Sequence, residues 1–155
     1  MAGRLEIRLT TGDVDLEKCC AGELDVRVTT GDVEMDTVTC RSALAIALGT
    51  GDAELTAVNC LDLAVEGTTA DLKLTDVKAV GALRLKATSG DILLERVDAG
   101  EMELYTTTGD VKGTLLSPKI FLAEATTGDV RVPQTATGGV CKIHTTTGDI
   151  QINIL

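Results

Sequence analysis

The apolar residues of this chain fall into fixed columns when the sequence is aligned on a repeated Gly-Asp pair. The pair follows one or two Thr residues, or Thr-Ser, and the repeat occurs in eight copies. The Gly positions are 12, 31, 51, 70 (an Ala), 90, 109, 128 and 148, so every interval is 19 or 20 residues. A period this regular indicates a single repeat domain over residues 1–155.

Within each copy, apolar residues occupy every second position on both sides of the Gly. The column seven residues before it contains Leu5, Leu24, Leu44, Leu63, Leu83, Met102, Phe121 and Cys141. Similar columns lie five residues before it and two and four residues after it. Alternation of this kind predicts two strands per repeat, each with one buried face. A further column, seven residues after the Gly, predicts a third, shorter apolar segment: Cys19, Val38, Val58, Val77, Val97 and Leu116.

A repeat of this length cannot bury its own apolar face, but parallel stacking of successive turns can. A leucine-rich repeat is disfavoured, because the chain lacks helical spacing and the Leu-x-x-Leu-x-Leu-x-x-Asn signature. The sequence therefore predicts an all-β fold, a single-stranded parallel β-helix (β-solenoid) of about eight coils of 19–20 residues. The general bias of parallel crossovers predicts that it is right-handed.

Composition limits the function. The chain has one Tyr, one Phe and no Trp, and its 14 Lys and Arg against 24 Asp and Glu give a formal net charge of −10. An anionic surface with few aromatic side chains argues against nucleic-acid binding. No apolar run approaches the roughly 18 residues of a membrane-spanning helix, and the first residues contain no apolar secretory region. We therefore expect a soluble chain without a membrane segment or signal, for which a cytoplasmic location is possible.

The repeated turn has a structural and a metal-binding interpretation. Gly permits positive φ, and the Asp carboxylate can accept hydrogen bonds from backbone N–H groups. Alternatively, calcium could relieve the repulsion between stacked carboxylates, with Asp13, Asp32, Asp52, Asp71, Asp91, Asp110, Asp129 and Asp149 as the weak candidate ligands. Ice binding is disfavoured because adjacent Thr residues on a strand point to opposite sides. We expect the structural role, and neither a metal site nor a cofactor.

The Cys and His residues give no catalytic pattern. Cys40 and Cys60 share a column with Ala21, Ala79, Ala99 and Pro118, which predicts a small buried corner residue, whereas Cys20 lies off the pattern and should face solvent. The single His144 lies in an outward column with Arg8, Arg27, Lys86 and Tyr105, without a recognisable nucleophile or base partner. The spacing of zinc ligands is matched only weakly by the adjacent Cys19 and Cys20 together with Cys40 and Cys60. We expect no enzymatic activity and no catalytic residues.

The last coils suggest a family. The segments Gly113–Phe121, Thr126–Pro133 and Gly138–Ile150 resemble the DUF4097 family of bacterial β-strand-repeat proteins, and the resemblance covers essentially the whole chain. Members are labelled adhesins, and some resemble proteins of cell-envelope stress loci in Gram-positive bacteria. The resemblance implies a non-catalytic β-helical module, an adhesin-like scaffold or binding protein, at the cell envelope or surface.

The ends of the predicted solenoid suggest a second function. An uncovered terminal turn presents unpaired backbone groups and apolar columns, and Ile150, Ile152 and Ile154 continue the alternation to the end of the sequence. We therefore expect self-association through the solenoid ends. The alternative function is a filament-forming scaffold that grows by end-to-end stacking.

Overall fold

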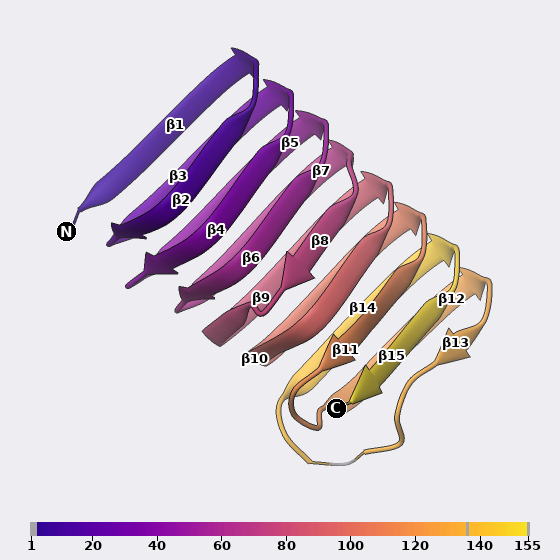
Figure 1. Cartoon of the computed structure of the whole chain (residues 1–155). Coiled ribbons are helices and arrows are strands. Elements are labelled where there is room, and N and C mark those ends of the chain that lie inside the picture. Colours follow the sequence, from indigo (N-terminus) through magenta and orange to yellow (C-terminus); the bar gives the residue numbers. More distant parts are fainter. Residues whose placement is uncertain (1–2, 136, 155) are drawn as a thin grey trace.

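The computed structural model describes residues 3–135 and 137–154, and these residues form a parallel β-solenoid with two strands per turn (Figure 1). One strand of each turn lies in a first layer: β1 (Arg4–Thr11), β3 (Glu23–Thr30), β5 (Ala43–Thr50), β7 (Asp62–Thr69), β9 (Lys78–Ser89), β14 (Val140–Thr147) and β12 (Ile120–Thr127). The other lies in a second layer: β2 (Val14–Ala21), β4 (Val33–Cys40), β6 (Ala53–Cys60), β8 (Leu72–Thr75), β11 (Val111–Leu115), β15 (Ile150–Ile154) and β13 (Val130–Arg131). The long strand β10 (Ile92–Thr108) passes through a corner and contributes to both layers.

The predicted columns form the core between the layers. Leu24 pairs with Leu44, and Leu44 with Leu63, so residues of one column stack on each other in neighbouring turns. Leu44, Leu55, Leu74 and Leu83 are fully buried. The predicted all-β solenoid is therefore confirmed, with about seven full turns. No helix is found in residues 3–135 or 137–154, and hence none that could cross a membrane.

In four turns the third apolar segment belongs to the second strand, with Cys19 in β2, Val38 in β4, Val58 in β6 and Val97 in β10. A residue with positive φ lies just before this segment and interrupts the alternation in five turns, namely Lys18 (52°), Thr37 (56°), Ala57 (54°), Asp76 (54°) and Arg96 (52°). Such a residue acts as a bulge and changes which side of the strand the following side chains face. The turn of β11 shifts register at this point, so that Leu115 pairs with Val97. Leu115 is buried and Leu116 is 38% exposed, so the prediction that Leu116 lies in the column is wrong.

The order of the last two turns differs from simple successive stacking. β14 pairs with β10 on one side and β12 on the other, and β15 lies between β11 and β13. The final turn, formed by β14 and β15, thus lies between the turn that contains β11 and the turn of β12 and β13. Figure 1 shows this position for the yellow β14 and β15. Pro133 follows β13 after one residue and has no N–H to donate to a neighbouring strand. An end position, which has a neighbour on one side, accommodates this short strand better than an internal position does.

The turns confirm the role predicted for the repeated Gly. Seven of these glycines have φ between 138° and 150°. A Cβ at Gly31 would lie 1.8 Å from the carbonyl oxygen of Gly12, so close stacking of the turns also requires Gly. Ala70 has no positive φ and is buried, and its Cβ lies 2.7 Å from where a Cβ of Gly67 would be. The methyl group of Ala70 therefore fills the space that Gly67 leaves in the core.

Candidate functional site

A groove of about 1270 Å³ runs over the outer side of the first layer. Its lining residues come from β3, β5, β7, β9, β10, β14 and β12, so the groove crosses seven neighbouring strands. Over β5 and β7 the groove is lined by outward residues with small side chains, namely Ala45, Ala47 and Ala64. The groove is thus an elongated depression that follows the axis of the solenoid.

Charged residues of both signs line this groove. Arg84 and Glu103 lie on neighbouring strands and form an ion pair of 3.2 Å, and Arg27 lies 3.6 Å from Asp25. These pairs are exposed, so each is expected to stabilise the fold by less than about 1 kcal/mol. The exposed Lys142 lies beside Glu103 in the ladder. The groove therefore offers hydrogen-bond donors and acceptors to a ligand at regular strand spacing.

Tyr105 and His144 form a stacked aromatic pair on the wall of the groove. Their ring centroids are 5.0 Å apart and the ring planes differ by 28°. The structure thus confirms that His144 lies in an outward column with Tyr105, which is 42% exposed. The two residues are neighbours because β14 is inserted next to β10; in successive stacking Tyr105 would lie beside Glu124. No sequence pattern indicates this contact, because it depends on the order of the turns.

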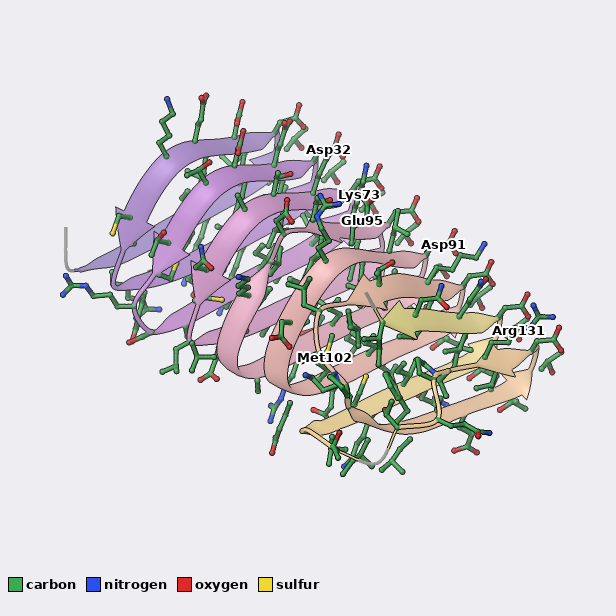
Figure 2. All side chains as sticks on the ribbon, turned by 60° about the horizontal axis from the view of Figure 1, so that its bottom comes forward. Asp32, Lys73, Asp91, Glu95, Met102 and Arg131 are labelled. Atoms are coloured by element: carbon green, nitrogen blue, oxygen red, sulfur yellow. The ribbon has the colours of Figure 1, made fainter. Side chains whose placement is uncertain are left out.

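The eight repeated Asp residues form a continuous ladder along one edge of the solenoid, on which Figure 2 labels Asp32 and Asp91. In seven cases the backbone N–H of one Asp donates to Oδ1 of the Asp in the neighbouring turn on the side of β1 and β2, at 2.8–3.3 Å. These bonds confirm the predicted structural role. Seven of the eight carboxylates proposed as weak calcium ligands, all except that of Asp129, therefore accept a hydrogen bond from a backbone group. Within residues 3–135 and 137–154, no three His, Cys, Asp or Glu side chains gather closely enough to hold a metal ion.

Comparison with known proteins identifies the family. The family model described as Toastrack DUF4097 matches residues 41–155. The chain belongs to the Toastrack DUF4097 family. Its first two turns precede the matched range, but β1 pairs with β3 and β2 with β4 in the same parallel register as the turns that follow. No curated protein and no solved structure matches the chain.

The cysteine thiols of this Toastrack domain differ in exposure as the sequence predicts. Cys20 is exposed, whereas Cys40, Cys60 and Cys141 are buried. Burial raises the pKa of Cys40 to about 11, with a further contribution from the neighbouring Cys19 and Cys20. Burial likewise raises the pKa of Cys60 and of Cys141 to about 12. These three thiols stay protonated at neutral pH and are poor nucleophiles and metal ligands.

The Toastrack domain contains a buried charged side chain that the repeat pattern does not predict. The predicted corner residue Pro118 is exposed, and Lys119 is buried instead, with 3% of its surface exposed. Its ammonium group donates to Oδ1 of Asp98 at 3.0 Å and to Ser117. Thr135 donates to the Lys119 carbonyl oxygen. The corner departs from the repeat because residues 116–119 must pass the inserted turn of β14 and β15 to reach β12.

The charge cluster around Lys119 is internally satisfied. Burial acts to raise the pKa of Asp98, but hydrogen bonds from Ser117 and Lys119 outweigh it and hold the pKa below its usual value. Ser117 Oγ donates to Asp98 Oδ1 at 2.6 Å. Lys119 is therefore paired with a carboxylate, an arrangement that fixes the corner.

Proposed function

We propose that this Toastrack domain is a non-catalytic, adhesin-like binding module of the bacterial cell envelope, and that the groove on the first layer holds its ligand. The observation that carries the proposal is the extent of the groove, which crosses seven strands of a rigid scaffold. Solenoids commonly bind partners along such extended surfaces. A groove of this length suits an extended polymer that lies across the strands.

The chemistry of the groove favours an extended polypeptide segment. Cations lie next to anions in the groove, with Lys86 beside Glu66 and Lys142 beside Glu103. This arrangement can pair with side chains of both signs, which are found on peptides. The small side chain of Ala64 leaves room for a backbone, and the Tyr105–His144 pair offers an apolar surface in the same groove. Location at the envelope is part of the proposal, and fractionation of cells with an antibody against the protein tests it.

The surroundings of the potential nucleophiles support a non-catalytic role. His144 stacks on Tyr105 and has Glu124 as its other neighbour in the ladder, with no Ser or Cys beside it in the register. The buried thiols of Cys40, Cys60 and Cys141 point into the core and have raised pKa values. A binding surface is thus better supported than an active site.

A random peptide library displayed on phage tests the groove. Peptides selected on the wild-type chain should bind with lower affinity to the Ala64→Arg variant, because the long side chain fills the groove floor. The matched control is Gln151→Arg, which adds the same side chain at an exposed position of the second layer. Affinities measured by calorimetry should fall at least tenfold for Ala64→Arg alone. Equal affinity for the two variants, or failure to select any binding peptide, would contradict the proposal.

A further inference from the structure

We infer that copies of this chain associate head to tail, with the edge formed by β12 and β13 of one copy stacked on β1 and β2 of the next. This interaction surface lies at the ends of the solenoid and overlaps the groove proposed above only at β12, where Glu124 lies. Among the described residues, β12 pairs with β14 alone and β13 with β15 alone, while β1 and β2 each pair with one strand at the opposite end. Each end thus presents an open parallel edge.

The backbone groups at the two ends are complementary. In each internal turn the N–H of the repeated Gly, or of Ala70, donates to the Thr or Ser carbonyl of the next turn, as Gly148 does to Thr127 at 2.9 Å. Among the described residues this series leaves Gly128 without an acceptor and the Thr11 carbonyl without a donor. A second copy in the same register brings these two groups together.

The Asp ladder shows the same complementarity. At one end, Oδ1 of Asp129 accepts no hydrogen bond within the part of the chain that the structure describes. At the other end, the N–H of Asp13 has no acceptor among those residues. Stacking of a second copy would extend the ladder by one Asp13–Asp129 bond across the junction. The geometry required is the one that the seven internal junctions already use.

Side chains at the junction are complementary in charge and in size. Continuing the ladder register places exposed Arg131 on exposed Asp15 and Glu124 on Arg8. On the core side it places Phe121 on Leu5, both of which are only half-buried in the single chain. The favourable charge pairs explain why a second copy, in this orientation, is the partner.

The charge distribution along one outer column of the second layer favours the same orientation. Its outer column reads Asp15, Glu34, Glu54, Lys73, Leu93, Lys112, Gln151 and Arg131 from one end of the solenoid to the other. Acidic residues therefore lie at the β2 end and basic residues at the β13 end; Figure 2 shows Lys73 and Arg131 in the basic part. Joining two like ends would oppose charges of the same sign, whereas head-to-tail stacking joins opposite charges.

A charge-reversal exchange tests the stacking. The purified 155-residue chain is compared with the single variants Asp15→Arg and Arg131→Glu by analytical ultracentrifugation over a range of concentrations. Each variant alone should associate at least tenfold more weakly, because its junction joins like charges. An equimolar mixture of the two variants should recover association, since every mixed junction again joins opposite charges. Both residues are exposed, and circular dichroism should show that both variants keep the fold.

Three results would overturn the inference. The first is a monomer at every concentration of the wild-type chain. The second is a closed dimer whose affinity neither charge reversal changes, which would indicate that like ends pair. The third is association that both reversals weaken but that the mixture does not recover. Wild-type species that grow with concentration, weaken in both variants and return in the mixture would support head-to-tail stacking.

Discussion

The backbone N–H of Asp149 donates to Oδ1 of Asp110 at 2.8 Å, although the two residues are 39 positions apart. The corresponding bonds elsewhere in the ladder join residues 19 or 20 positions apart. This contact therefore shows that the last turn lies between the two turns that precede it in the sequence. The same insertion brings Tyr105 beside His144 in the candidate site.

The turn order can be tested by disulfide trapping. Thr108 pairs with Thr147, whereas Thr108 and Thr127 are separated by the inserted turn. Cysteines at 108 and 147 should therefore form a disulfide in the Cys20→Ser background. Cysteines at 108 and 127 should not, because two strand spacings, about 9.5 Å, exceed the reach of a disulfide. Peptide mapping by mass spectrometry distinguishes the pairs, and efficient formation of the 108–127 disulfide alone would indicate successive stacking.

The Asp carboxylates of the ladder should stabilise the fold because they accept hydrogen bonds from backbone N–H groups of the neighbouring turn. Asp91→Ala removes the acceptor of the Asp110 N–H, a bond of 2.8 Å, and should lower the free energy of unfolding by about 1–2 kcal/mol. The control is Asp129→Ala, because the Asp129 carboxylate accepts no hydrogen bond within the described residues. In dilute protein the control should change stability by less than about 0.5 kcal/mol. Urea denaturation measures both, and equal losses would argue against a role for the acceptor.

The bulge residue Thr37 should be strained. Its φ of 56° is rare for a β-branched side chain, whereas Gly adopts it freely. Thr37→Gly should therefore raise the free energy of unfolding by about 1 kcal/mol. Thr39→Gly, at a position of the same strand without positive φ, should lower it by about the same amount. Thermal melts of the two variants should shift in opposite directions; a shift in the same direction would contradict the assignment of strain.

The cluster around Lys119 should make stability sensitive to acid. The pKa of Asp98 is lower in the folded protein than its unfolded value of about 3.9, so its ionised form favours folding above that value. This contribution is lost as the pH falls through the folded pKa. Asp98→Asn should therefore lower the free energy of unfolding near pH 7 by about 1–2 kcal/mol, a value reduced by the partial exposure of Asp98.

The acid prediction is checked by urea denaturation of the wild type and Asp98→Asn at several pH values. The difference between them should shrink as the pH falls below about 4, because the wild-type carboxyl then becomes protonated too. A difference that stays constant across this range would show that the ion pair with Lys119 does not provide the stabilisation. Leu93→Ala serves as a control without a titrating group, since Leu93 is 40% exposed on the second layer.

Much of the fold follows from the repeated pattern because burial alternates with strand geometry. Leu24, Leu44 and Leu63 occupy one column in the sequence and stack in the structure, since each turn buries the same positions. The third apolar segment was misassigned because the positive φ at Thr37 has no marker in the sequence; neither Lys18 nor Thr37 is a Gly or Asn. Leu116 was misplaced because the turn of β11 lacks this bulge residue.

The sequence by itself determined the period, the layers and the chemistry of the turn, because these depend on interactions that every repeat makes in the same way. Tertiary structure alone decided which turn lies next to which, since near-identical repeats can stack on one another in more than one order. That choice fixes the buried position of Lys119, the contact between Tyr105 and His144, and the identity of the terminal strand β12. The groove and the open end both result from it, because a surface built from several turns depends on their order in space.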